Sequence, residues 1–309
     1  MHDIKRIREN PEAFDAAMKR RGLEPLSARI LELDKENRGS KTRLQELQTE
    51  MNQMARNIGE LKAKGENADV VIARSKELKT QIAALKESES TGGEVEPQGE
   101  LQDLLLGLPN ILLEQVPDGA DESDNVKVRQ WGTPREFSFA PKEHFDIAEA
   151  KGWLDFTQTA KMSGARFASL FGPLARLERA LAAYMLEVHT KEFGYTEVSP
   201  PYMVRSQAMV GTSQLPKFKE DLFGTSEDRW LIPTAEVSPT NLVREQILDA
   251  AELPLRYTAF TPCFRAEAGS AGKDTRGLIR QHQFSKVELV SITTPEQADE
   301  EHERLTRAA

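Results

Sequence analysis

Apolar residues follow a heptad repeat through an early part of the chain. From Leu44 they recur at spacings of 3, 4, 3, 4 and 3 residues, at Leu44, Leu47, Met51, Met54, Ile58 and Leu61. After a polar turn at 63–69, the same kind of spacing returns at Val71, Ser75, Leu78, Ile82 and Leu85. Such a seam is typical of helices that pack along their length. The pattern therefore predicts an antiparallel hairpin of two helices.

The first helix of this hairpin is expected from about residue 30 to about residue 66. At 1.5 Å per residue it would extend roughly 55 Å, which is too long to lie buried against the rest of the chain. We expect the hairpin to project into solvent as an arm. The heptad pattern by itself favours a coiled coil that forms a dimer.

Shorter patterns flank this arm. Asn10 and Pro11 begin a predicted helix that Gly22 ends, since Asn caps a helix start and Pro suits its first turn. The stretch at 87–100 is rich in Gly and acidic residues, which weakens its helix signal. We expect a hinge near residues 90–118.

The second half of the chain contains strand signals. A helix is predicted from Gly172 to Phe193, ended by Gly194 and followed by a strand that Pro200 and Pro201 interrupt. From Phe264 to Val290 the pattern is a strand, a polar loop and a second strand. The loop is rich in Gly and basic residues, namely Gly269, Gly272, Lys273, Arg276 and Gly277.

The two strands of this segment carry charged residues and one aromatic. The first is expected to carry Arg265 and Glu267, and the second carries Phe284, Lys286 and Glu288, which alternate and so share one face. An open face with these groups suits a nucleotide and a small cationic ligand. Charge alone favours an ordinary solvated hairpin, so the pattern leaves both interpretations open.

Composition narrows the class of protein. The chain has 309 residues and a net charge of −9, which argues against a general polyanion binder. Residues 1–66 hold 14 Lys and Arg against 12 Asp and Glu, a net charge of +2, whereas the remainder carries −11. No apolar run reaches the roughly 18 residues of a membrane-spanning helix, and the first residues show no apolar signal core.

Cysteine and histidine usage bears on location and on metals. The single cysteine, Cys263, excludes an internal disulfide framework and suits a reducing cytoplasm. It follows the pattern of a packed thiol rather than a nucleophile. The five histidines show no i, i+4 pair, so we expect no metal site built from histidines, and a single cysteine excludes a cysteine-based zinc site.

Longer strings resemble a known family. TPCFRAEAGSAG at 261–272, DTRGLIRQHQF at 274–284 and KVELV at 286–290 resemble motif 2 of the class II aminoacyl-tRNA synthetases, in the form found in seryl-tRNA synthetases. The predicted helix, glycine and strand that end at Pro201 resemble motif 1. KMSGARF at 161–167 and GTSQLPKF at 211–218 are further matches.

A three-residue match adds the amino-acid site. Thr234, Ala235 and Glu236 match the serine-binding triplet of the seryl family. The chain departs from the family pattern at Ser213, where glycine is usual, at Ser238, where proline is usual, and at Ala266, where serine is usual.

The resemblance implies a fold and a division of the chain. The fold class is α+β, with an N-terminal antiparallel helical coiled-coil arm and an incomplete class II synthetase catalytic domain built on an antiparallel sheet. The tRNA-binding arm is expected at residues 1–110 and the catalytic core at residues 111–309. Motif 1 implies a homodimer.

The resemblance also implies an activity, that of a cytoplasmic serine–tRNA ligase. Such an enzyme activates L-serine with ATP and Mg²⁺ to seryl-adenylate and transfers the seryl group to tRNA(Ser), and in the family also to tRNA(Sec). The implied catalytic residue is Arg265, which would hold the α-phosphate. The implied ATP-binding residues are Arg265, Ala266, Glu267 and Phe284, and the implied serine-binding residues are Thr234, Ala235, Glu236 and Glu288. The loop Gly269–Gly277 is expected to order over ATP or the acceptor end.

The match is incomplete at its end. No glycine follows Gly277, and the last 16 residues, from Thr294, predict a capped acidic helix. Motif 3, with its second ATP-binding arginine, is missing from the pattern, so we expect a truncated catalytic domain. Two further functions therefore stay open beside the ligase: a non-catalytic remnant that binds tRNA or forms a dimer through the arm and motif 1, and a ligase for an acceptor other than tRNA.

Overall fold

The computed structural model describes residues 2–89, 99–268 and 276–309. The chain divides into two compact units, Met1–Trp131 and Gly132–Ala309. Within the described residues, no helix combines the length and the apolar character needed to cross a membrane.

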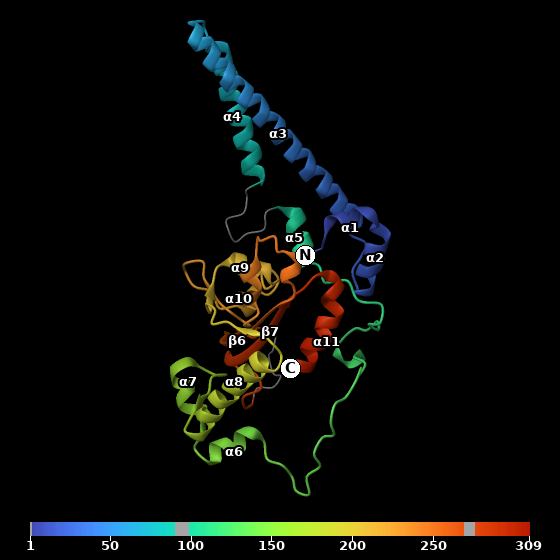
Figure 1. The fold of residues 1–309 in the computed structure, drawn as a ribbon, viewed down its shortest axis with the longest axis vertical. Coiled ribbons are helices and arrows are strands. Elements are labelled where there is room, and N and C mark those ends of the chain that lie inside the picture. Colours follow the sequence, from blue (N-terminus) through green and yellow to red (C-terminus); the bar gives the residue numbers. More distant parts are fainter. Residues whose placement is uncertain (1, 90–98, 269–275) are drawn as a thin grey trace. The chain divides into compact units, whose positions relative to one another are not determined.

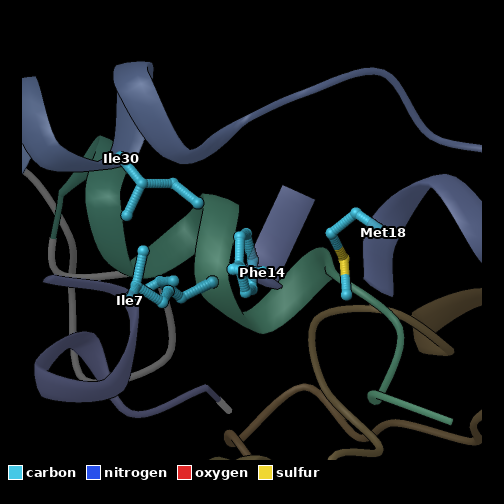
Figure 2. Packing of buried hydrophobic residues seen from close by; sticks show 5 residues of the cluster. Ile7, Phe14, Met18 and Ile30 are labelled. Carbon is cyan, nitrogen blue, oxygen red and sulfur yellow. The ribbon is translucent and has the colours of Figure 1, made fainter. Parts of the chain in front are cut away.

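The first unit has a small helical core. Its helices are α1 (Ile4–Glu9), α2 (Pro11–Arg20), α3 (Ser27–Lys64), α4 (Asp69–Glu89) and α5 (Glu100–Gly107). As predicted, Asn10 caps α2 by accepting a hydrogen bond from the Ala13 N–H, with Pro11 in the first turn. Figure 2 shows the buried side chains that close the core, among them Ile7, Phe14, Met18 and Ile30, with Leu105 from α5 in the same cluster.

The helical hairpin forms as the heptad pattern predicts. Helices α3 and α4 run side by side (Figure 1), joined by a short turn in which Gly65 takes a left-handed conformation with φ of 71°. Leu47, Leu78 and Ile82 are buried along the seam. Seam residues Leu44, Met51, Met54 and Leu85 are partly buried against them. The antiparallel arm is thereby confirmed.

The predicted hinge contains a helix. Of the interval 90–118, residues 90–98 lie outside the described part, but α5 follows at once and buries Leu105 at 5% exposure in the core of the first unit. The prediction of a hinge was wrong for residues 100–107, which form a packed helix. The apolar positions of this short helix follow an acidic, glycine-containing stretch, so the sequence pattern did not predict it. Between Leu108 and Glu143, all of which is described, the only helix or strand is the short 3-10 helix η1 (Glu122–Asp124).

The second unit mixes short helices with three small sheets. Its elements are α6 (His144–Ala150), β1 (Leu154–Asp155), α7 (Thr157–Ser163), β2 (Ser169–Leu170), α8 (Pro173–Lys191), β3 (Thr196–Glu197), β4 (Met203–Val204), α9 (Ser206–Gly211), η2 (Lys219–Asp221), β5 (Trp230–Leu231), α10 (Val237–Thr240), η3 (Asn241–Val243), η4 (Ala250–Glu252), β6 (Leu255–Phe264), β7 (Gln283–Ile292), η5 (Pro295–Gln297) and α11 (Ala298–Ala308).

The largest of these sheets has the order β3-β6-β7. Strands β6 and β7 are antiparallel, with Cys263 opposite Phe284 and Ala259 opposite Glu288. The short β3 lies at the edge and is parallel to β6, so the sheet is mixed rather than purely antiparallel. The α+β class is confirmed.

The two faces of the β6–β7 hairpin have different neighbours. On one face, Ser285 donates to Glu178 of α8, and Ser291 donates to Glu301 of α11. Because strand residues alternate in direction, Phe284, Lys286 and Glu288 point to the opposite face, as predicted. Helices α8 and α11 thus cover the back of the hairpin and leave its charged face to the segment around Thr234.

Two predicted helices of this unit are confirmed. Helix α8 begins after Gly172, and Gly194 takes a φ of 69° before β3, which reproduces the predicted helix, glycine and strand. At the other end, Thr294 and Gln297 form a capping box ahead of α11.

Candidate active site

Residues from several separate segments line one cavity beside the charged face of the β6–β7 hairpin. The cavity has a volume of about 280 Å³. It is lined by Gln214, Phe218, Asp221, Leu222, Pro233, Thr234, Arg265, Glu267 and Arg280. A larger groove of about 1130 Å³ lies in the first unit, but none of the predicted site residues lines it.

Thr234, Lys286 and Glu288 form one hydrogen-bonded cluster. The Thr234 hydroxyl donates to Glu288 Oε2 over 2.9 Å and accepts from Lys286 Nζ over 3.0 Å. Lys286 and Glu288 also form an ion pair. Thr234 is 5% exposed. The chain thus holds a hydroxyl, a carboxylate and an ammonium in one place, although Thr234 precedes Glu288 by 54 residues.

Glu236 adds a second carboxylate to this cluster. Burial raises the pKa of Glu236 above its ordinary value, and the neighbouring charge of Glu288 raises it further. Lys286 and Arg265 act in the opposite direction. The cluster thus holds two carboxylates with Lys286 and Arg265 as their neighbouring cations, and a carboxylate is the side chain that attracts a small cationic ligand. Ala235, between Thr234 and Glu236, is fully buried.

Arg265 lies beside an aromatic ring. Its guanidinium carbon is 5.1 Å from the centre of the Phe284 ring, and its Nε donates to the Pro233 carbonyl over 3.1 Å. Stacking and this single bond orient the guanidinium, whose planar fork of donors matches phosphate oxygens. An aromatic face next to a guanidinium is a suitable arrangement for a nucleotide.

The backbone leaves the strand immediately after Phe264. The Ala266 N–H donates to the Asp221 carbonyl over 2.8 Å, and the Ala268 N–H donates to Asp221 Oδ1 over 2.8 Å. Glu267 adopts a φ of 53°. The prediction that Arg265 and Glu267 belong to the first strand was therefore wrong. The strand ends at Phe264, the Arg265 N–H still bonds the facing His282 carbonyl, and Asp221 draws the chain away from Ala266 onward.

Glu267 and Ala266 have local partners in this turn. Glu267 accepts a hydrogen bond from Arg280 over 2.7 Å, and both side chains line the cavity. The Ala266 N–H already donates to Asp221, and the residue has no hydroxyl. Any contact of Ala266 with a nucleotide would therefore use its carbonyl or its methyl group.

Three residues at this site have roles that the sequence patterns did not predict. Asp221 holds the turn, Arg280 pairs with Glu267, and Lys286 joins Thr234 to Glu288. The alternation of β7 had placed Lys286 on the face of Phe284 and Glu288, but its bond to Thr234 depends on a distant segment. Asp221 carries no local signal, because its importance depends on a backbone 45 residues farther along the chain.

Two departures from the family pattern have structural explanations. Ser238 donates to the Pro201 carbonyl over 2.7 Å and is buried, so its hydroxyl has a partner. Ser213 takes a φ of 60°, a conformation that glycine adopts without steric cost.

The loop predicted to cover the ligand is described only at its end. Gly269, Gly272 and Lys273 lie outside the described residues. Arg276 stacks on Phe145 of α6 with 4.7 Å between guanidinium carbon and ring centre. Gly277 has a φ of 74°, and a Cβ atom there would lie 2.5 Å from both His144 and Phe145, so a side chain at this position would be strained.

Two further points concern the reactivity of Cys263 and the capacity of the described side chains to bind a metal ion. Cys263 is fully buried, and burial raises the pKa of its thiol, as expected of a packed thiol. Within the described ranges, no three His, Cys, Asp or Glu side chains are grouped so that they could hold a metal ion.

Two family models match the chain. The seryl-tRNA synthetase N-terminal domain matches residues 1–112, and the tRNA synthetase class II core domain (G, H, P, S and T) matches residues 218–309. Among curated relatives, the serine–tRNA ligases of Rhodospirillum centenum and Zymomonas mobilis are 56% identical over 309 residues and 55% identical over 311 residues. Each match covers 100% of this chain and 72% of the relative.

Solved structures agree with these relatives. The seryl-tRNA synthetase of Pyrococcus horikoshii, solved in complex with ATP, is 37% identical with a TM-score of 0.77, over 99% of this chain and 73% of that one. The cytoplasmic serine–tRNA ligase of Naegleria fowleri, in complex with AMP, is 28% identical with a TM-score of 0.73, over 97% of this chain and 68% of that one. With both family models and these relatives in agreement, the chain belongs to the seryl-tRNA synthetases, a family of ATP-dependent class II aminoacyl-tRNA ligases.

Proposed function

We propose that this polypeptide activates L-serine with ATP to seryl-adenylate and passes the seryl group to tRNA(Ser), with tRNA(Sec) as a further acceptor. One observation carries the proposal. The Thr234–Lys286–Glu288 cluster and the stacked pair of Arg265 and Phe284 lie on the same face of the β6–β7 hairpin, and Thr234 and Arg265 line one cavity. These are the groups that an amino acid and a nucleotide would need side by side.

Serine recognition is assigned to the acidic cluster. Glu236 and Glu288 would attract the serine ammonium, and Thr234, with the backbone around Ala235, would bond polar atoms of the ligand. The Thr234–Glu288 hydrogen bond would be exchanged for bonds to serine. A site that bonds a hydroxyl rejects alanine strongly, because its buried polar atoms are then left unpaired.

ATP recognition is assigned to the stacked pair and its neighbours. Phe284 would stack on adenine, Arg265 would bond the α-phosphate, and Glu267 and Ala266 would contact the nucleotide around the turn. A serine carboxylate oxygen attacks the α-phosphorus, a P–O bond to pyrophosphate breaks, and pyrophosphate leaves. The nucleophile is already ionised, so no general base is needed and positioning with charge stabilisation supplies most of the rate.

The transfer step then uses the same site. The terminal ribose hydroxyl of the tRNA attacks the seryl carbonyl and an ester bond forms. AMP leaves with the electrons of the broken anhydride bond, and the hydroxyl proton passes to the leaving phosphate or to water. The loop that includes Gly269–Gly277 is assigned to ATP or to the acceptor end.

Mg²⁺ is proposed as a companion of ATP rather than as a resident of the protein. The described residues contain no ready-made group of metal ligands. Mg²⁺ usually retains waters and binds through substrate phosphates with one or two carboxylates, of which Glu267 is the candidate here. When bound, the ion would offset phosphate charge.

The remaining assignments concern the whole chain. We assign tRNA binding to residues 1–110 and catalysis to residues 111–309. The stripe of exposed apolar side chains on α8 supports a homodimer built on motif 1: Leu177, Leu181, Tyr184 and Met185. The lone, fully buried Cys263 supports a cytoplasmic location.

Serine-dependent ATP–pyrophosphate exchange tests the proposal. It should be run on this chain and on a longer chain that continues through the remainder of the relatives' length. Serine-dependent exchange in either one, with charging of tRNA(Ser), is the expected result. Exchange in neither would overturn the ligase proposal and favour a non-catalytic tRNA-binding protein. Exchange without charging would favour an acceptor other than tRNA.

A further inference from the structure

The hydrogen-bond ladder between β6 and β7 closes at Arg265 in an unusual way. The Arg265 N–H donates to the His282 carbonyl over 2.9 Å, as in an ordinary antiparallel pair. The reciprocal donor would be the His282 N–H, but this group donates over 3.0 Å to the carbonyl of Arg166 instead. The ladder would therefore leave the Arg265 carbonyl without its usual partner.

The side chain of His282 supplies that bond. Its Nδ1 lies 2.9 Å from the Arg265 carbonyl oxygen. A carbonyl only accepts hydrogen bonds, so Nδ1 must carry the proton. With the proton on Nε2 alone, two lone pairs would face each other at this distance. The geometry thus requires a proton on Nδ1 of His282.

The imidazole is fixed by two aromatic neighbours. The Phe167 ring centre lies 5.4 Å from it, and the Phe223 ring centre lies 6.1 Å from it at an angle of 86°. Arg166 adopts a φ of 61°, which brings its carbonyl to the His282 N–H. The segment 161–167 therefore contacts His282 in two ways. The Arg166 carbonyl bonds the His282 N–H in place of the ladder, and Phe167 packs against the His282 ring.

The bond from His282 Nδ1 to the Arg265 carbonyl lies at the point where the chain leaves β6. Beyond Arg265 the backbone departs toward Asp221, and Glu267 has a positive φ. The Arg265 carbonyl is bonded to His282 directly before this departure, and beyond it the Glu267 side chain pairs with Arg280. A shift there would move the guanidinium away from Phe284 and from the Pro233 carbonyl.

We propose that His282 is a positioning residue for Arg265, acting through the bond from its Nδ1–H to the Arg265 carbonyl. It contacts neither serine nor ATP. It fixes the backbone from which the guanidinium reaches the nucleotide. The proposal rests on the proposed function in so far as Arg265 is taken to bind the α-phosphate.

Two substitutions separate this bond from simple packing. His282→Asn keeps an N–H donor at nearly the position of Nδ1 and loses the ring. His282→Phe keeps a ring between Phe167 and Phe223 and loses the donor. If His282 only fills space, the Phe variant should be the milder one; if it positions Arg265, the Asn variant should be.

Three measurements on the full chain test the proposal. Nitrogen-15 NMR of labelled histidine should show a proton on Nδ1 of His282 that is absent from the His282→Phe spectrum. Amide hydrogen exchange at Arg265 should accelerate about tenfold or more in His282→Phe and little in His282→Asn, as the loss of one buried bond predicts. ATP affinity by calorimetry should fall about tenfold in His282→Phe and stay within about threefold in His282→Asn.

The outcomes are distinguishable from failure of the proposed function. An unprotonated Nδ1, or equal exchange at Arg265 in both variants, would overturn the positioning role whatever the ATP result. If the unchanged chain binds no ATP while the NMR and exchange results hold, the positioning of Arg265 stands and the assignment of Arg265 to ATP falls. Equal ATP affinity in all three proteins would refute the link from His282 to the nucleotide.

Discussion

The molecule contains two hairpins that are held together by different physical means. In the helical hairpin α3–α4, Leu47, Leu78 and Ile82 form an apolar seam, and charges such as Arg74 and Glu50 pair at the surface with side chains 40% and 34% exposed. Such surface pairs contribute little to stability. In the strand hairpin β6–β7, the charged groups lie inward, and the Glu288 side chain is 18% exposed.

The difference determines how each hairpin tolerates change. A repeated seam spreads its stabilisation over many similar contacts, so any one of them can be weakened with a graded effect. The strand hairpin depends on single bonds to distant segments, such as Thr234 to Glu288 and Asp221 to Ala268. The two hairpins should therefore fail separately and in different ways.

The largest expected effect is the loss of serine activation in Arg265→Ala. Without the guanidinium, charge that develops at the α-phosphate is no longer offset, and exchange should fall by at least about a thousandfold in the active form. The affinity of the arm for tRNA should not change. ATP–pyrophosphate exchange and tRNA binding measure the two hairpins independently.

A matched substitution makes that test specific. Arg244→Ala removes an arginine whose contact with Glu245 is long, at 3.7 Å, and exposed, in the same unit but away from the cavity. It should leave exchange within about twofold of the unchanged protein, as expected for a surface site. Equal losses of tRNA binding and exchange in Arg265→Ala would show that the hairpins do not divide the work as proposed.

The next effect concerns the seam of the helical hairpin. Leu78 is fully buried, so Leu78→Ala should lower the free energy of unfolding of the arm by about 2–4 kcal/mol through lost burial and a residual cavity. Urea unfolding followed by circular dichroism measures this loss. Val70→Ala, on the same helix at a residue 82% exposed, should change it by less than about 0.5 kcal/mol.

The activity of these arm variants sharpens the comparison. Leu78→Ala should weaken tRNA binding and leave serine-dependent exchange unaltered. A fall in exchange that matches the loss of arm stability would mean that the strand hairpin depends on the helical one, and the contrast between them would then be false.

How far the sequence predicts each hairpin follows from the range of the contacts involved. The heptad pattern is local, and it placed the ends of α3 within three residues of Ser27 and Lys64. The alternation of β7 is local too, and it put Phe284, Lys286 and Glu288 on one face. The apolar face of α5 was missed because its pattern is short and follows an acidic stretch.

The site was harder to predict for the same reason. The family resemblance supplied Arg265, Thr234, Glu236 and Glu288 as candidates, and their roles remain predictions. The end of β6 was misplaced because the strand stops where the Ala266 N–H bonds the Asp221 carbonyl. The residues near Arg265 contain no pattern that predicts this contact. Contacts between distant segments are invisible to periodicity.

A smaller effect is the pH dependence of serine binding, which is expected at the strand hairpin and not at the helical one. The pKa of Glu236 is raised above its ordinary 4.5 by burial and by Glu288. As the pH falls from about 7 toward about 4.5, Glu236 should take up a proton and lose its attraction for the serine ammonium, with serine affinity falling about fivefold. Glu236→Gln should weaken serine binding near pH 7, where Glu236 is charged, have little effect at low pH, and so flatten this dependence. Calorimetry over this range measures both.

Stability should change in the opposite direction over the same range. Because folding raises the pKa of Glu236, its contribution to the free energy of unfolding is fully present below 4.5 and is lost as the pH rises through the folded-state pKa. Glu227→Gln, at an exposed position of the same unit, serves as the control. If serine affinity falls with pH as steeply in Glu236→Gln as in the unchanged protein, another group is responsible.

The smallest effect contrasts one residue near the strand hairpin with one in the helical hairpin. Ser213 has a φ of 60°, which costs a side-chain-bearing residue about 1 kcal/mol. Gly59 lies inside α3 with nothing within 4 Å of where a Cβ would be. Ser213→Gly should therefore raise the free energy of unfolding by about 0.5 kcal/mol, after the added freedom of the unfolded chain is subtracted. Gly59→Ala should raise it by about 0.5–1 kcal/mol.

A serine-to-glycine change should thus stabilise one region and a glycine-to-alanine change the other. A serine-to-glycine change at an unstrained position tests whether backbone strain at Ser213 is the cause. Ser163→Gly is the matched control. Ser163 is the last residue of helix α7 and has no positive φ, so this substitution should lower the free energy of unfolding by up to about 1 kcal/mol. Thermal unfolding of the three variants decides the matter. If Ser213→Gly and Ser163→Gly destabilise equally, the backbone at Ser213 carries no strain. The neighbourhood of the site would then follow the same general propensities as the arm, instead of the requirements of individual positions.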